Sequence, residues 1–313
     1  MRKVRKFVFI TFAAFLLIIT FSYVNHQVQL SKENERFIPN GMLTEVNDYQ
    51  MHVYSEGTGN DTLVFLSGSG TSSPVLDFKS LYTLLSDTYQ IAVVERAGYG
   101  FSEVSDSERD LDTMLSETRK ALFQSGVKGP FILVPHSMSG IEALHWAQTY
   151  PEEVKAIIGL DMAVPAIYEQ MNINMTFLRM GKLAADIGVT RWIPALAESD
   201  AITYGTLTEE EKELYKVIFY RRTATKNMLN ETAQIKDNAK LVQEHLPVNV
   251  PILLFSSNGQ GTGWNENEWV GFQQEFIAGQ ESGDLVELDC SHYVHDIEYK
   301  QIAEESVQFI KKL

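Results

Sequence analysis

The sequence predicts an α/β fold: a doubly wound, mostly parallel sheet with a helical cap insertion and an N-terminal transmembrane helix. Short apolar segments typical of buried strands alternate with amphipathic helical segments in both halves of the chain, and this alternation indicates a parallel sheet covered on both faces. Residues 162–248 interrupt it with helical periodicity and no clear strand. Residues 7–24 are uncharged, apolar and long enough to span hydrocarbon.

The core elements follow in order on either side of the insertion. Residues 43–46 and 50–54 alternate polar and apolar side chains around a turn, which predicts a hairpin at the start of the first core part, residues 41–161. The second core part is residues 249–313. The other strands are predicted at 63–66, 91–94, 131–134, 154–160, 252–255 and 285–288, and helices at 78–85, 111–123, 141–147 and 299–311.

The insertion, residues 162–248, is predicted to form a lid because it joins two strand ends. Its large apolar side chains mostly pack the lid itself. Together they also favour a pocket for an apolar acyl or aromatic group. These side chains are Tyr168, Met171, Met175, Phe177, Met180, Trp192, Tyr204, Tyr215, Phe219 and Tyr220.

The N-terminus predicts a membrane anchor. Residues 1–6 carry four basic side chains and no acidic one, and the first acid after the apolar segment is Glu33. The positive-inside rule then places residues 1–6 in the cytoplasm and the body outside, joined by a linker at 25–40. The alternative is a cleaved signal peptide and a secreted protein, but its apolar region is typically shorter and no Ala-x-Ala-like site follows. A buried core helix fits the basic flank less well.

Charge and cysteine content exclude several classes of function. The net charge of −15 argues against nucleic-acid binding, which needs basic surface. The body beyond residue 6 is more acidic still, so the anchor alone is expected to hold it at anionic lipid. The single cysteine, Cys290, permits no intramolecular disulfide and no cysteine-rich zinc site.

A serine follows the predicted strand 131–134 and precedes the predicted helix 141–147. The segment reads Pro-His-Ser-Met-Ser-Gly and places Ser137 at the turn. Such a strand-to-helix turn is strained and projects the hydroxyl, so it requires small flanking residues. Glycine usually stands two residues before and after the serine, whereas this chain has Pro135 and Ser139.

Four segments in order carry a family resemblance: 66–69, 95–102, the serine turn at 135–140, and 291–295. Over about residues 41–313 the chain resembles a capped, single-domain serine hydrolase of the α/β-hydrolase superfamily. The resemblance implies that Ser137 is the nucleophile and His292 its base, because a serine hydroxyl needs an adjacent base. His295, three residues on, is the rival base. The other histidines and Cys290 are expected to be non-catalytic, and Glu95 and Arg96 to form internal ion pairs.

The triad acid is expected to be Asp161. The family usually places it after the strand at 252–255, but residues 256–263 contain no carboxylate, and Glu266 and Glu268 come too late. Some members carry the acid after the preceding core strand, where Asp161 stands. A carboxylate buried there needs a partner such as His292. The alternative is a capping or turn aspartate.

The resemblance also implies an oxyanion hole, formed by the backbone N–H groups of Met138 and Ser69. Gly68 and Gly70 would give the second loop its reach. The expected activity is hydrolysis of an ester or amide through an acyl-enzyme, like a carboxylesterase or lipase, on a small molecule with an apolar acyl or aromatic part. No cofactor or metal is implied. Alternatives are an acyltransferase or aminopeptidase on the same triad, or a non-catalytic ligand-binding protein of this fold.

Overall fold

A computed structural model describes residues 1–313 and centres on an eight-stranded sheet of order β1-β2-β4-β3-β5-β6-β7-β8. Its first two strands form an antiparallel hairpin, and β3 to β8 run parallel. The mostly parallel sheet is therefore confirmed. The strands are β1 (Met42–Val46), β2 (Tyr49–Glu56), β3 (Thr62–Leu66), β4 (Gln90–Glu95), β5 (Phe131–Pro135), β6 (Val154–Leu160), β7 (Ile252–Ser256) and β8 (Gly283–Glu287).

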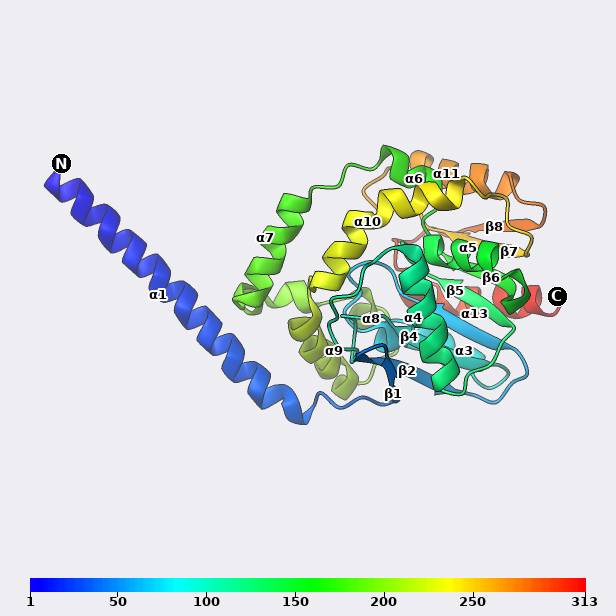
Figure 1. Cartoon of the computed structure of the whole chain (residues 1–313), viewed down its shortest axis with the longest axis horizontal. Helices are drawn as coiled ribbons and strands as arrows, with labels where there is room; N and C mark the ends of the chain where they lie inside the picture. Colours follow the sequence, from blue (N-terminus) through cyan, green and yellow to red (C-terminus); the bar gives the residue numbers. More distant parts are fainter.

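Helices cover both faces of the sheet, so its central strands are buried on both sides (Figure 1). Alternate side chains of β5 show the reason for its unbroken apolar sequence: Leu133 packs in one apolar core, and Ile132 and Val134 pack in the other. The core helices are α2 (Pro74–Asp77), α3 (Lys79–Leu85), α4 (Leu111–Gln124), α5 (Ser139–Thr149), α11 (Glu266–Ala278), α12 (Val294–Ile297) and α13 (Tyr299–Ile310).

The regular elements between β6 and β7 are all helices, and this segment covers one end of the sheet (Figure 1). Side chains at the helix starts satisfy free backbone N–H groups: Asn174 caps α7, and Thr208 with Glu211 forms a capping box on α9. The elements are α6 (Pro165–Gln170), α7 (Met175–Asp186), η3 (Val189–Trp192), η4 (Pro194–Ala197), α8 (Asp200–Thr203), α9 (Glu209–Arg222) and α10 (Lys226–Gln243).

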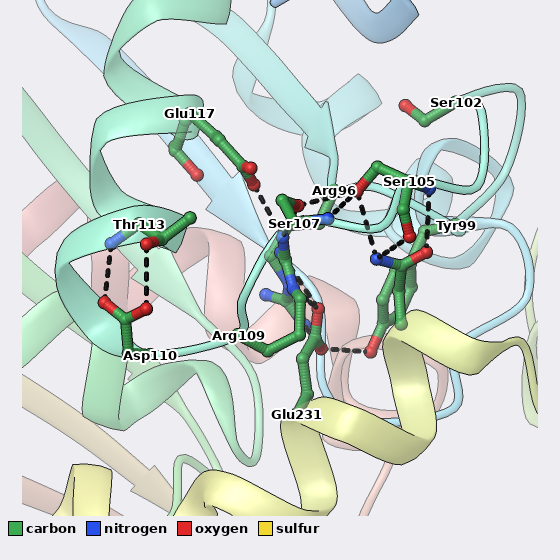
Figure 2. A network of polar contacts seen from close by, with 12 residues as sticks. Arg96, Tyr99, Ser102, Ser105, Ser107, Arg109, Asp110, Thr113, Glu117 and Glu231 are labelled. Atoms are coloured by element: carbon green, nitrogen blue, oxygen red, sulfur yellow. Dashed lines mark hydrogen bonds and ion pairs between the residues drawn. The ribbon is translucent and has the colours of Figure 1, made fainter. Parts of the chain in front are cut away.

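A buried ionic network fixes the cap helix α10 to the core (Figure 2). Glu231 of α10 accepts hydrogen bonds from Arg96 (3.3 Å), Arg109 (3.3 Å) and the Tyr99 hydroxyl (2.6 Å). Arg96 also pairs with Glu142 of α5 at 3.2 Å. Because every one of these side chains is buried, an unpaired member would be costly, so the network holds α10 in one position.

The N-terminal helix α1 (Arg2–Lys32) projects from the body as one long rod (Figure 1). At 1.5 Å per residue its 31 residues span about 46 Å. Its length and apolar composition are sufficient to cross a membrane. It continues through residues 25–32 of the predicted linker at 25–40, and Ser22 and His26 are buried where the body packs against it. Tertiary contacts therefore extend the helix.

Candidate active site

Ser137 lies in the tight turn between β5 and α5 with a left-handed backbone, φ 53°. Such a conformation is strained for a residue with a side chain. The residues that replace the usual glycines fit the turn. Pro135 ends β5, and the Ser139 hydroxyl donates to the carbonyls of Leu66 (2.6 Å) and His136 (2.8 Å).

Ser137, His292 and Asp161 form a continuous hydrogen-bonded chain. The His292 Nε2 atom lies 2.9 Å from Ser137 Oγ, and its Nδ1 atom lies 2.6 Å from Asp161 Oδ2. His292 follows β8 on the loop before α12, and Asp161 follows β6 directly. With a proton on Nδ1, the imidazole donates to the carboxylate and Nε2 is free to accept from the serine.

Asp161 is fully buried and accepts three hydrogen bonds besides the one from His292. Ser257 donates through its backbone N–H (2.7 Å) and its hydroxyl (2.7 Å), and Trp269 donates through Nε1 (2.7 Å). Ser257 thus stands where the family usually carries the acid and instead orients an acid from the neighbouring strand. Sequence reasoning did not find Ser257 or Trp269. The only sequence feature that pointed to them was the absence of a carboxylate in the loop at residues 256–263.

The loop after β3 approaches the serine closely. A Cβ added to Gly68 would lie 2.8 Å from the Ser137 Cβ, so this position requires glycine. The backbone N–H groups of Ser69 and Met138 donate to no other protein group. They are the two groups predicted for the oxyanion hole. The Ser69 hydroxyl also lies 3.3 Å from Thr232 of α10, so the cap touches this loop.

His295, the rival base, lies away from Ser137. Its Nε2 atom is 3.0 Å from Asp77, and both side chains are fully buried. His136 lies between the two histidines, with ring centroids 4.6 Å from each. Burial, with His292 and His295 alongside, holds the pKa of His136 well below its usual value. His136 is therefore neutral at physiological pH.

A second polar cluster lies behind the site, where the Asp296 carboxylate approaches Asp77 and His295. Asp296 is fully buried, and neither of its oxygens has a hydrogen-bond partner. Burial, with Asp77 and Asp200 nearby, raises the pKa of Asp296 well above its usual value. The sequence analysis did not single out this cluster.

The remaining candidates have structural surroundings. The Glu95 carboxylate lies 2.9 Å from His52 Nδ1, whereas Arg96 forms ion pairs with Glu142 and Glu231, so Glu95 and Arg96 do not pair with each other. Glu268 caps α11. Burial raises the pKa of the Cys290 thiol to about 12, which makes it a poor nucleophile.

A cavity of about 250 Å³ lies where the cap meets the loop after β3. Gly70, Thr71 and Ser72 line one side, and Leu196, Phe219 and Tyr215 of the cap line the other. A larger cavity, about 640 Å³, lies between α4 and the start of β5, and neither cavity is lined by Ser137, His292 or Asp161. The smaller cavity adjoins the loop that carries Ser69, because the next residue, Gly70, lines it.

Comparison with known proteins agrees with this geometry. Residues 61–199 match the family model described as alpha/beta hydrolase fold, and the chain belongs to the α/β-hydrolase superfamily. It is similar to uncharacterized protein YbdG of Bacillus subtilis, with 38% identity covering 99% of this chain and 98% of YbdG. Uncharacterized protein YqjL of the same organism is 24% identical over 77% of this chain and 80% of its own.

Solved structures show the same fold with different chemistry. Epoxide hydrolase VrEH1 from Vigna radiata superposes with a TM-score of 0.67 at 19% identity, over 87% of this chain and 97% of its own. A putative lipase from Acinetobacter baumannii gives 0.64 at 15% identity, over 92% and 96%. Haloalkane dehalogenase DbeA from Bradyrhizobium elkani gives 0.64 at 17%, over 87% and 97%. Likeness at this level establishes the fold, and the reaction has to be argued from the site.

Proposed function

We propose that the protein is a serine hydrolase that cleaves a carboxylic ester through an acyl-enzyme, in the manner of a carboxylesterase or lipase. The observation that carries this proposal is the chain of hydrogen bonds from Ser137 through His292 to Asp161, beside two free N–H groups. A serine hydroxyl attacks a carbonyl carbon, and directed N–H donors stabilise the oxyanion that results.

The reaction proceeds in two steps, acylation of Ser137 and hydrolysis of the acyl-enzyme. Ser137 Oγ bonds to the substrate carbonyl carbon as its proton passes to His292 Nε2, and the N–H groups of Met138 and Ser69 hold the oxyanion. The ester C–O bond then breaks, and His292 returns the proton to the alcohol that leaves. Water attacks the acyl-enzyme with His292 again as base, which releases the acid and restores Ser137. Asp161 holds the imidazole tautomer and stabilises the imidazolium.

The cap supports an apolar acyl group as the recognised part of the substrate. Leu196, Tyr215 and Phe219 line the cavity next to the predicted oxyanion-hole loop. Glu198 and Asp200 line its other part, and no basic residue does. An apolar chain there would be stabilised by about 0.8 kcal/mol per buried methylene.

We further propose that α1 anchors the protein in a membrane by a single pass, with residues 1–6 in the cytoplasm and the body outside. Residues 7–24 of α1 expose large apolar side chains such as Phe7, Phe12 and Leu17. Water strongly disfavours such a surface, and hydrocarbon accommodates it. The basic cluster before Phe7 supports this orientation.

The test uses the full chain in detergent with a fluorophosphonate probe and p-nitrophenyl esters of increasing chain length. Wild type should label and hydrolyse, and Ser137→Ala should lose labelling and about 10⁴-fold or more of kcat/KM. Ser125→Ala is the matched control, since this hydroxyl bonds only to the Ala121 carbonyl at the end of α4, away from the site. A Ser137→Ala variant near wild-type activity, or a folded wild type that neither labels nor hydrolyses any ester, would remove the proposal.

A further inference from the structure

Large apolar side chains lie exposed together on one part of the cap. These side chains belong to α7, η3 and η4, and the surface that they form is here called the cap apolar surface. The members, with their exposed fractions, are Phe177 (71%), Met180 (64%), Leu183 (59%), Trp192 (56%), Ile193 (49%) and Leu196 (50%).

Contiguous exposed apolar surface marks an interaction site, and the position of α1 indicates the partner. Trp192 donates from Nε1 to Ser22 Oγ at 2.9 Å, and its ring lies 6.0 Å from that of Phe21. Ser22 is near the end of the apolar segment 7–24. The cap apolar surface therefore begins at the level where α1 would leave the hydrocarbon, which is where tryptophan is enriched in membrane proteins.

Polar contacts fix this arrangement. Arg191 makes two bonds of 2.7 Å to the Glu33 carboxylate and one of 2.9 Å to His26 Nδ1. A bidentate arginine–carboxylate pair has a defined geometry. The cap is therefore held against α1 at a set height and rotation.

The direction of α7 fits a membrane surface. In Figure 1, α7 runs across the direction of α1 and lies on the side of the body nearest the N-terminal half of α1. Phe177, Met180 and Leu183 share its exposed side at helical spacing, with Arg179 and Lys182 between them. An apolar stripe flanked by basic residues is typical of helices that lie in the interface with the apolar face about 5–10 Å deep.

We propose that the cap apolar surface inserts into the outer interface of the bilayer crossed by α1, so that an ester dissolved in the membrane enters the active site from lipid. Leu196 links the two features, because it belongs to the exposed surface and also lines the cavity beside the loop after β3. This inference rests on the proposed anchor and deepens the proposed substrate to a membrane-soluble ester.

The test places nitroxide labels on single cysteines in the full chain, reconstituted in phosphatidylcholine nanodiscs. The positions are Phe177→Cys and Met180→Cys on α7, Leu16→Cys on α1, and Phe123→Cys, an 82% exposed apolar residue of α4, as the matched aqueous control. Buried Cys290 does not compete for the label. Collisions with oxygen and with a nickel chelate report lipid and water, respectively.

The α7 labels should show an oxygen-to-nickel ratio several-fold above that of the Phe123 position and approaching that of the Leu16 position. A lipid-exposed Leu16 label with α7 labels as accessible to nickel as the control would overturn the inference and leave the anchor standing. A Leu16 label in water would remove the anchor, and the inference with it. Labels on α7 shielded from both reagents would show a protein partner or a second copy instead of lipid, which also overturns it.

Discussion

At the residue scale, the Asp161 carboxylate accepts three hydrogen bonds in addition to the one from His292. The three hydrogen bonds from Ser257 and Trp269 fix the orientation of its carboxylate independently of His292. A carboxylate fixed in this way needs no reorganisation as the imidazolium forms, which is the condition for electrostatic stabilisation of a transition state.

Replacement of Asp161 by asparagine should lower kcat/KM on an activated ester by about 10⁴-fold, because the histidine loses the group that fixes its tautomer. Glu268→Gln is the matched control, since that residue caps α11 at the surface, and it should stay near wild type. Circular dichroism checks that both variants fold. If Asp161→Asn keeps most of its activity, Asp161 is not the acid.

Asp296→Asn should raise Tm at pH 8 and have less effect near pH 4. The folded pKa of Asp296 is raised above its unfolded value, so its contribution to stability is fully present below the unfolded pKa, about 3.9. That contribution is lost as pH rises through the folded pKa, where a buried carboxylate without a partner must ionise. The exposed Asp284→Asn variant controls for loss of charge. A fall in Tm at pH 8 would mean that the Asp296 carboxylate has a cationic partner.

Part of this site was predictable from local sequence. Ser137 and Asp161 each follow an apolar strand. The carboxyl ends of parallel strands lie at the same edge of the sheet, so the sequence already indicates that the two residues lie at that edge. Ser257 and Trp269 were not predictable, because their contact with Asp161 depends on how the start of α11 packs against the end of β6. That packing leaves no periodic signal in the chain.

At the element scale, the cap is fixed both to the hydrolase core and to the N-terminal helix α1. Its helix α10 is tied to the core through Glu231, whereas η3 is tied to α1 through Arg191. The sequence predicted the helical insertion because its periodicity differs from that of the strands. It did not predict that α1 continues past residue 24, where His26 is buried and accepts a hydrogen bond from Arg191 of η3.

Glu231→Gln should destabilise the protein by about 3–5 kcal/mol, because it leaves Arg96 and Arg109 buried with one fewer anionic partner. Urea unfolding of the full chain in detergent measures the loss. Exposed Glu210 of α9 offers the control substitution Glu210→Gln, which should change stability little. A Glu231→Gln variant as stable as this control would mean that the network does not hold α10.

At the scale of the whole molecule, the chain combines one apolar rod, an acidic body and a cap that contacts both. The mostly parallel sheet and its order of elements were predictable because each strand is a short apolar segment between helical ones. The position of the rod against the cap was not, since it depends on a few long-range contacts of Ser22, His26 and Glu33.

If α1 spans a membrane as proposed, the bidentate contact between Arg191 and Glu33 would let lipid composition act on the proposed active site. A thicker or thinner bilayer changes the tilt of a helix that spans it, and a rigid contact carries that tilt into η3 and the neighbouring η4, whose Leu196 lines the cavity. Activity in nanodiscs should therefore vary with the acyl-chain length of the lipid. Arg191→Ala should flatten that dependence, and an unchanged dependence would show that tilt is not transmitted through this contact. If Arg191→Ala does flatten the dependence, the membrane acts as an allosteric ligand whose relevant property is its thickness.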